Sequence, residues 1–237
     1  MTFIVTRDCI QLGLRAGAIA FWGVRVGPAP DELRAETVRG VRAIRQLFAG
    51  LAEARSCAEV TALQALHRRV GVKPRREQSS VERLLGLALK RGELPAINSL
   101  VDAYNLVSLR SRCSLGAHDL DAITPPVRLT LLTGQESFIP LGEREPVAVV
   151  PGEYGYVDAA GRLLCRLDVR QVDFSKVTEA TRNVLLIVEG TTAQAPDALC
   201  RAYDEAIQEV RRWCGGLAQI VASPVEDRGE EVARDSR

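Results

Sequence analysis

The chain has 237 residues, of which 46% are hydrophobic, and its formal net charge is +1 at neutral pH. The hydrophobic fraction suffices for a real core, and the near-zero charge excludes an overall attraction to nucleic acid, so any RNA contact must be local. No segment approaches the roughly 20 apolar residues of a membrane span, no signal peptide is recognisable, and the six cysteines form no CxxC pair. We therefore expect a cytoplasmic protein with reduced thiols, without a metal or other cofactor and without a membrane partner.

The first third of the chain predicts a strand and two helices. Residues 14–26 are rich in β-forming residues and end at a Gly-Pro pair, which indicates a strand that leads into a turn. Residues 31–54 carry apolar side chains near helical spacing, and acidic residues stand at the start, where they favour a helix N-terminus. A second helix is expected from an N-cap at Ser56 to Val70.

A polar, basic segment follows these helices. Lys73, Arg75 and Arg76 surround a proline, and they form the best basic patch of the chain. They are candidates for contacts with RNA phosphates, and the alternative is a solvated linker between helices. Ser79 and Glu82 then match the capping box of a further helix.

Between residues 97 and 123, polar side chains interrupt segments that are otherwise suited to burial. An apolar stripe at helical spacing predicts a core helix that begins near residue 97. The interrupting residues are Asp102, Asn105, His118, Asp119 and Asp121. An unpaired buried polar group costs about 1–3 kcal/mol, so these side chains should hydrogen-bond within the fold or line a pocket for a polar ligand.

The second half of the chain changes to short β-prone runs between Gly, Pro and charged turns. The predicted strands cover residues 127–132, 146–150, 154–158, 162–169 and 183–189, with a hairpin over 154–167. A last helix is expected to begin at Pro196 and to end before a Gly-Gly pair. Residues 223–237 lack an apolar period and are expected to form a disordered tail. These patterns predict one mixed α/β domain over residues 1–222.

Several motifs in this order resemble one protein family. They are Val101-Asp102-x-x-Asn105, the segment 115–123, the segment 134–142, the Pro-Gly-Glu run at 151–153, the pairs Cys165-Arg166 and Arg170-Gln171, and the segment 178–188. Together they resemble the B3/B4 domain of the bacterial phenylalanyl-tRNA synthetase β subunit, and more closely the freestanding B3/B4 proteins. The resemblance spans roughly residues 60–215.

The resemblance implies an α/β (α+β) fold with a central mixed β-sheet flanked by helices, and an association with tRNA. In the synthetase this domain hosts an editing site, where a wrongly attached amino acid is hydrolysed from the terminal ribose. The synthetase motif has His where this chain has Gly116, and Phe where this chain has His118. If the segment is extended, positions two residues apart share one face, so the imidazole would stay on the same face.

We therefore expect a deacylase that hydrolyses a mischarged aminoacyl-tRNA in trans, without a catalytic triad. His118 is the candidate that orients or activates water, because an imidazole accepts a proton near neutral pH, and the alternative is a satisfied structural histidine. Asp119 is expected to orient the imidazole or to bind the substrate amine, or else to cap a turn. Glu153 stands near the position where the family carries an acidic pocket residue, so it is a candidate for recognising a hydroxyl or amine of the substrate. The alternative is that Glu153 is only a turn residue.

The remaining candidate residues fall into two groups. Substrate-binding candidates are Asn98, Asp102, Asn105, Gly116, Asp121, Gly152 and Thr178. Asp102 and Asn105 have the alternative role of fixing the helix to the neighbouring loop. Arg170 and Gln171 join the basic patch as RNA-binding candidates, although Arg170 also suits a surface salt bridge. His67 is expected to be an ordinary helix residue.

Two other functions remain open from the sequence. A non-catalytic RNA-binding or tRNA-binding module would keep the fold without the chemistry, and the Gly116/His118 exchange and near-neutral charge favour it. An amino-acid sensor would bind a free amino acid without tRNA. The sequence does not specify the amino acid, the tRNA or the oligomeric state.

Overall fold

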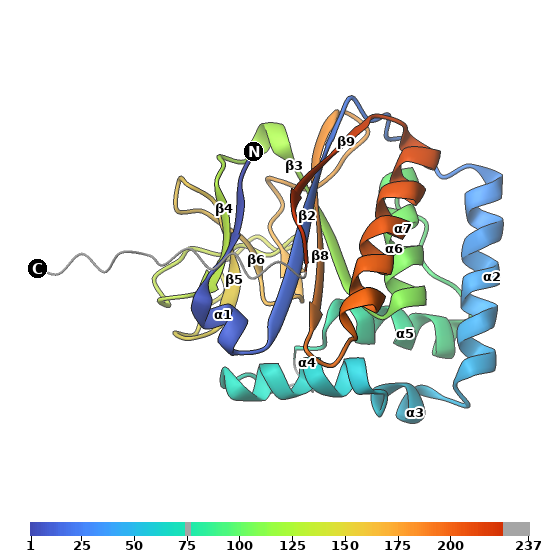
Figure 1. Ribbon diagram of the computed structural model, residues 1–237, viewed down its shortest axis with the longest axis horizontal. Coiled ribbons are helices and arrows are strands. Elements are labelled where there is room, and N and C mark those ends of the chain that lie inside the picture. The colour runs from blue at the N-terminus through green and yellow to red at the C-terminus, as the bar shows by residue number, and fades with distance from the viewer. Residues whose placement is uncertain (74–76, 225–237) are drawn as a thin grey trace, which may run out of the picture.

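The structure is a computed structural model that describes residues 1–73 and 77–224. Its strands form two sheets (Figure 1). One sheet is antiparallel, with the strand order β3 (Ser114–Asp119), β8 (Asn183–Thr191), β2 (Leu14–Trp22) and β9 (Leu217–Ala222). The other has the order β1 (Phe3–Val5), β4 (Val127–Leu131), β5 (Tyr154–Val157), β6 (Leu163–Arg166) and β7 (Arg170–Gln171), and only β1 and β4 are parallel.

Helices α6 (Ser99–Ser111) and α7 (Pro196–Cys214) cover the four-stranded sheet on the face opposite to the five-stranded sheet, whereas α1 (Arg7–Gln11) lies against β2 and β4 (Figure 1). The described helices are α1 (Arg7–Gln11), α2 (Asp31–Leu47), α3 (Leu51–Arg55), α4 (Ala58–Arg69), α5 (Ser80–Arg91), α6 (Ser99–Ser111), the 3₁₀ turn η1 (Leu120–Ala122) and α7 (Pro196–Cys214). Helices α6 and α7 pack together, and α2 lies outside α6. No helix in the described ranges is long and apolar enough to cross a membrane.

Strand β8 contributes to the two largest hydrophobic clusters of the described residues, one on each of its faces. Leu185 and Ile187 belong to the core that fills the space between the sheets. Leu186 and Val188 belong to the second core, against α6 and α7. This alternation follows from the two-residue period of a strand, and it explains why the run at 183–189 is apolar at nearly every position.

Local signals fix the helix ends next to the site. The Ser79 side chain accepts a hydrogen bond from the Glu82 backbone N–H at 3.2 Å, which confirms the predicted capping box. Helix α5 ends at Gly92, whose φ of 77° is left-handed. Asn98 caps α6 by accepting from the Val101 N–H at 2.9 Å.

The mixed α/β class is confirmed, but the strands divide into two sheets instead of one central sheet. The expected helix over 31–54 is interrupted, because Phe48 adopts an extended conformation and α3 begins only at Leu51. No strand forms over 146–150, where only Val149 is buried. The short strand β1 and the edge strand β9 were not expected, and the predicted disordered tail lies outside the described residues from 225 onward.

Candidate functional site

A cavity of about 430 Å³ lies between the two sheets, along the β3 edge of the four-stranded sheet. Helices α5 and α6, strands β3 and β8, and strands β5 to β7 all contribute to its wall. The cavity therefore brings together the segment 97–123 and the strands of the second half of the chain, as the sequence predicts.

The wall formed by β3 and β8 follows from their antiparallel register. Gly116 pairs with Ile187, and both residues face the cavity. His118 lies two residues from Gly116 and faces the same cavity, which agrees with the expected shift of the imidazole along one strand face. A Cβ added to Gly116 would meet no atom within 4 Å, so this position contributes open space.

Strand β3 also presents backbone groups to the cavity. The Asp119 N–H donates to the Ser175 carbonyl at 2.9 Å, so it points away from β8. In an antiparallel pair, residues two apart along a strand direct their N–H and C=O groups to the same side. Leu115 and Ala117 line the cavity, and their backbone groups therefore face it along the free edge of the sheet.

His118 is buried and electrically neutral at physiological pH. Its Nδ1 lies 2.9 Å from the Ser175 Oγ, and no hydrogen bond to a described residue involves its Nε2. Burial lowers its pKa to about 4, because no carboxylate compensates for the loss of solvent. The imidazole is therefore a weak base that orients a hydrogen-bonding partner through Nε2.

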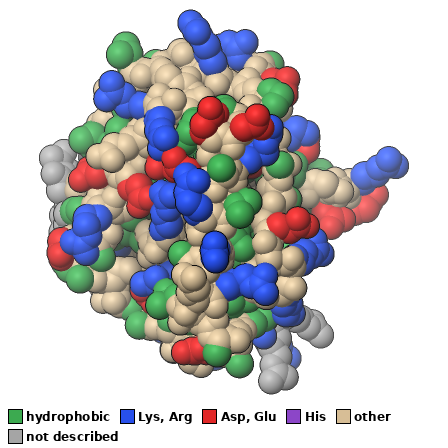
Figure 2. Space-filling model, turned by 90° about the vertical axis from the view of Figure 1, so that its right-hand side faces the viewer, with side chains coloured by type: hydrophobic (Ala, Val, Ile, Leu, Met, Phe, Trp, Pro, Cys, Tyr) green, Lys and Arg blue, Asp and Glu red, His purple; other side chains and the backbone are tan. Residues whose placement is uncertain are grey.

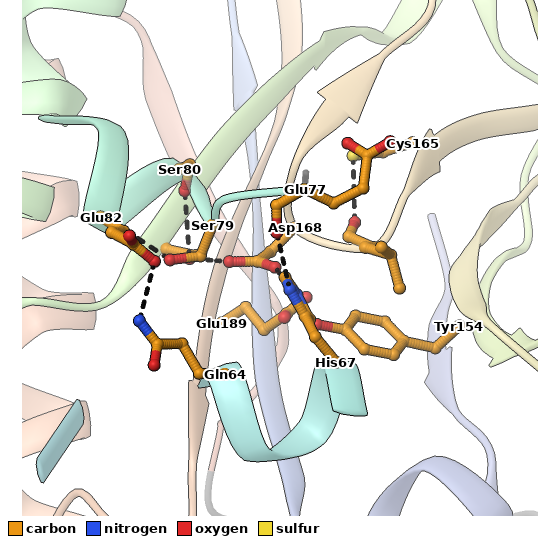
Figure 3. A network of polar contacts seen from close by, with 12 residues as sticks. Gln64, His67, Glu77, Ser79, Ser80, Glu82, Tyr154, Cys165, Asp168 and Glu189 are labelled. Carbon is orange, nitrogen blue, oxygen red and sulfur yellow. Dashed lines mark hydrogen bonds and ion pairs between the residues drawn. The ribbon is translucent and has the colours of Figure 1, made fainter. Parts of the chain in front are cut away.

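A polar network is centred on Asp168, a buried residue of the cavity wall (Figure 3). Asp168 accepts hydrogen bonds from Ser114 Oγ at 2.8 Å and Tyr154 OH at 3.2 Å. His67 Nε2 lies 2.8 Å from its Oδ1. His67 is thus not the ordinary helix residue that the sequence suggested, because α4 directs its imidazole to a buried carboxylate.

Glu189 lies beside this network and has one unpaired oxygen. Its Oε2 accepts a short hydrogen bond from Tyr156 OH, whereas Oε1 has no partner among the described residues. Burial raises the pKa of Glu189 to about 8, and the charge of Asp168 raises it further in the same direction. At neutral pH this side chain is mainly a neutral carboxylic acid within the cavity wall.

Basic and polar side chains surround the outer part of the cavity. Arg83, Arg170 and Lys176 contribute to its lining, together with Gln171. Arg170 also lies 3.7 Å from the Glu143 carboxylate, which is the surface salt bridge considered for it from the sequence. The cavity consequently combines a basic outer part with an acidic inner part.

A second cavity of about 180 Å³ lies between α2 and the loop before α6. Asn105 lines both cavities, whereas Asp102 lines only the second one. Figure 2 shows the side of the molecule where α2 faces the viewer, and basic side chains gather along the middle of this face. Arg39, Arg42 and Arg45 are exposed on α2.

Glu153 does not line the cavity. It is fully buried, and both of its carboxylate oxygens pair with Arg166, at 2.6 Å to Nε and 2.7 Å to Nη2. A buried carboxylate requires such a partner, so the predicted pocket residue instead joins β6 to the turn before β5.

Asp119 and Asp121 also turn away from the cavity lining. Asp119 accepts from the Asp121 N–H at 3.0 Å and from the Thr181 Oγ1 at 2.6 Å, so it caps the turn η1. Asp121 accepts from Asn183 Nδ2 at 3.0 Å. Neither carboxylate contacts His118, and the alternative of a capped turn describes their geometry.

The other substrate-binding candidates support the backbone around the site. Asn98 caps α6, and Asp102 accepts from the Ile97 N–H at 2.9 Å, which fixes the helix to its loop. Gly152 has a φ of 89°, as a turn requires, and Thr178 accepts from the Ala180 N–H at 3.3 Å. Of the seven candidates, Asn105 and Gly116 line the large cavity.

Little of the predicted basic patch is described. Lys73 is exposed, and its carbonyl accepts from the Glu77 N–H at 3.2 Å. Arg75 and Arg76 lie outside the described residues. Arg170 and Gln171 are the predicted RNA-binding residues that line the cavity.

The sequence interpretation missed the acidic end of the cavity. Asp168 and Glu189 each stand within or directly after a run of apolar, β-forming residues. A charged residue in such a run must be paired or must face a polar space, and that signal was available for both. Tyr156 and His67 gave no separate signal, because both side chains suit ordinary core positions.

Comparison with known proteins gives consistent relatives. The chain is 31% identical over 104 residues to the phenylalanine–tRNA ligase β subunit of Pyrobaculum aerophilum, covering 36% of this chain and 20% of that protein. It is 29% identical over 105 residues to the β subunit from Methanospirillum hungatei, covering 36% and 19%. The chain therefore spans about a fifth of the length of these curated relatives.

A solved structure was also found to be similar. An N-terminal fragment of the phenylalanyl-tRNA synthetase β subunit from Pyrococcus horikoshii aligns with 92% of this chain and 50% of that chain, with 14% identity and a TM-score of 0.46. Residues 63–215 of the present chain match the B3/4 domain, which is well over half of its length. The chain belongs to the B3/4 domain family.

Proposed function

We propose that this protein hydrolyses the ester bond of a mischarged aminoacyl-tRNA, acting on tRNA in trans. The observation that supports this most is the cavity along the free edge of β3, where Gly116 provides space and His118 provides a neutral imidazole. The relatives support the tRNA part of the proposal, because both are β subunits of a phenylalanine–tRNA ligase.

The backbone edge of β3 suits the carbonyl of an ester. The N–H of Ala117, next to His118, would donate to the carbonyl oxygen and stabilise the negative charge that develops as water adds. Such donors cost no reorganisation, because the sheet fixes them before the substrate arrives. The C–O bond to the ribose then breaks, and the proton released by the water ends on the ribose oxygen.

His118 would position the attacking water instead of removing its proton. With a pKa of about 4, the imidazole is a poor base at neutral pH, but its Nε2 can hydrogen-bond to water at a fixed place. Ser175 holds the ring from the other side through Nδ1. Of the two roles considered for His118 from the sequence, orienting or activating water, burial without a neighbouring carboxylate favours the first.

The basic outer part of the cavity would receive the tRNA. Arg83, Arg170 and Lys176 lie where the terminal phosphates would approach an amino acid that occupies the cavity. An arginine offers a forked donor to phosphate, whereas a lysine acts as a point charge. The near-neutral net charge of the chain makes these few local contacts necessary for tRNA binding.

The direct test is deacylation of a panel of mischarged tRNAs by the full chain, measured as release of the amino acid. We expect at least one member to be hydrolysed well above the buffer rate. His118→Ala should slow this reaction by about 10²-fold while tRNA binding stays intact, since a positioned group is lost. Absence of hydrolysis above buffer for every tRNA, with active control deacylases, would falsify the proposal.

A non-catalytic tRNA-binding module is the second candidate. The low basicity of His118 favours it, because a general base with a pKa near neutral pH is absent from that position. This function predicts tRNA binding by the wild-type chain with no hydrolysis to lose. The His118→Ala variant then behaves like the wild type in both assays.

A further inference from the structure

Glu189 is the feature of the cavity that the proposed chemistry does not use. Its side chain is 2% exposed and belongs to the cavity lining, and its Oε1 has no hydrogen-bond partner among the described residues. Buried carboxylate oxygens are normally paired, so an unpaired one on a side chain that lines a cavity is suited to a ligand.

No positively charged group among the described residues packed around Glu189 pairs with its carboxyl. The groups around it are Asp168 after β6, Tyr154 and Tyr156 on β5, Cys165 on β6, Cys9 on α1, Ser114 opposite it on β3, Ala16 opposite it on β2, and His67 on α4. His67 is the basic group among these described neighbours, and its charge is paired with Asp168. Figure 3 shows the Glu189 carboxyl beside this cluster. The inner end of the cavity therefore has one more acidic group than it has cations.

The register of β3 and β8 places Glu189 far from His118. His118 pairs with Leu185 and Ser114 pairs with Glu189, so the two side chains are four residues apart along one face, roughly 13 Å. An ester held beside His118 would reach Glu189 only through a long side chain.

From these observations we propose that the cavity accepts an amino acid with a long side chain that ends in a cationic amine or guanidinium, and that Glu189 pairs with this group. The ester end of this assignment rests on the proposed hydrolysis, whereas the pairing with Glu189 does not. An incoming cation would favour the ionised form of Glu189, so binding should release a proton, because the free carboxyl is mainly neutral.

The first experiment measures binding of free amino acids to the full chain by calorimetry. L-lysine, L-ornithine and L-arginine are compared with L-norleucine, whose side chain has a similar length and carries no charge. Measurements at neutral pH in two buffers of different ionisation enthalpy give the number of protons released, which should be about one for the basic amino acids. Glu189→Gln should weaken the binding of lysine at least about tenfold and abolish the proton release, while norleucine is unaffected.

Glutamine is a suitable replacement, because its amide oxygen can accept from Tyr156 as the carboxyl does, so folding should be retained. Glu145→Gln is the matched control, since Glu145 is exposed and lies outside the cavity lining. This control should leave binding and proton release unchanged. Thermal unfolding of both variants verifies that they are folded.

The second experiment compares hydrolysis of tRNA charged with lysine, arginine or norleucine. Faster hydrolysis of the basic esters, lost in Glu189→Gln, supports the assignment. If other aminoacyl-tRNAs are hydrolysed and the basic ones are not preferred, the assignment is overturned while the deacylase function stands. If no ester is hydrolysed but lysine binds in a Glu189-dependent way, the cation site stands and the deacylase function fails. Equal affinity for lysine and norleucine overturns the assignment.

Discussion

His67 Nε2 lies 2.8 Å from Asp168 Oδ1, and this contact joins α4 to the end of β6 across 101 residues of sequence. Burial alone would lower the pKa of His67, but the hydrogen bond and charge of Asp168 raise it above its ordinary value. For Asp168, burial would raise the pKa, and His67 outweighs this and lowers it. His67 and Asp168 therefore form an ionised pair at the acidic inner end of the cavity.

Replacing His67 with glutamine should lower the free energy of unfolding by about 3–5 kcal/mol near pH 5.5, because it leaves a buried carboxylate without its charged partner. A histidine whose pKa is raised by folding makes its full contribution to the free energy of unfolding below its unfolded pKa of about 6.5. That contribution is lost as the pH rises through the folded pKa. Asp168 stabilises above its unfolded pKa of about 3.9, and this is lost as pH falls through the folded value. Denaturation in urea should show the largest difference from wild type between these limits, and an equal difference from pH 5 to 9 would contradict the ionised pair.

The pKa values of the two histidines of the chain should be shifted in opposite directions from the ordinary value. His118 should lose its proton near pH 4, whereas His67 should stay protonated above the ordinary histidine range. Proton NMR of the imidazole signals tests this directly, and the His67→Gln variant assigns them. A titration of His118 near pH 6.5 would mean that the ring is accessible to solvent, and it would restore the possibility of a general base.

The sequence predicted the backbone of the site better than its chemistry. Apolar periodicity located α6 and β8, and the Ser79 and Glu82 pair located the start of α5, because these signals act within a few residues. The partners of Glu153 and His67 lie 13 and 101 residues away, so no local pattern identifies them. For Glu153, adjacency to a predicted pocket strand was misleading, because the pairing with Arg166 depends on the fold.

The division of the strands into two sheets could also not be predicted from the sequence. Strand β9 has exposed side chains at Leu217 and Ile220, so it lacks the alternating pattern that identifies a half-buried strand. Strand β1 has only three residues, Phe3–Val5, and forms through parallel pairing with β4. Both strands depend on pairing with distant segments, which a single sequence does not reveal.

Gly116 on β3 and Gly155 on β5 should respond differently to an added side chain. Gly116→Ala should change stability by no more than about 0.5 kcal/mol, since no atom lies within 4 Å of the added Cβ and the backbone is not left-handed. Gly155→Ala should destabilise by about 1–3 kcal/mol, because its Cβ would lie 2.7 Å from the Cys165 carbonyl oxygen. Chemical denaturation compares the two variants.

A larger side chain at Gly116 tests whether the substrate needs the space beside β3, without a large change in the stability of the fold. Gly116→Leu should remain folded and fill part of the cavity, so deacylation and amino-acid binding should both fall. Normal activity of a folded Gly116→Leu protein would show that the substrate does not occupy the space beside β3.

Arg170 provides a test of tRNA binding through salt dependence. If Arg170 contacts one phosphate, Arg170→Gln should reduce the slope of log K against log salt by about 0.7–0.9. Arg201→Gln is the control, because Arg201 is exposed on α7 and pairs with Asp197, 3.0 Å away. Filter binding at several salt concentrations measures both slopes, and identical slopes for the two variants would exclude a phosphate contact at Arg170.

Glu153 distinguishes a structural role from a role in catalysis. Glu153→Gln should lower the free energy of unfolding by about 3–5 kcal/mol, because it leaves the buried Arg166 guanidinium without its carboxylate. The rate of deacylation per folded molecule should stay unchanged, since Glu153 does not line the cavity. Urea denaturation measures the loss of stability, and the deacylation rate divided by the concentration of folded protein measures the effect on catalysis.

The double variant Glu153→Leu with Arg166→Met sharpens this test. Replacing both members of a buried ion pair with apolar side chains of similar volume is often neutral or stabilising, whereas removing one member is not. Arg166 also contacts Glu77 at 3.3 Å, and Glu77 is partly exposed, so water can replace that contact. The double variant should therefore be more stable than Glu153→Gln and equally active. If the double variant is stable but inactive and Glu153→Gln has also lost activity per folded molecule, the Glu153 carboxylate takes part in the reaction, as its position in the sequence motif suggested.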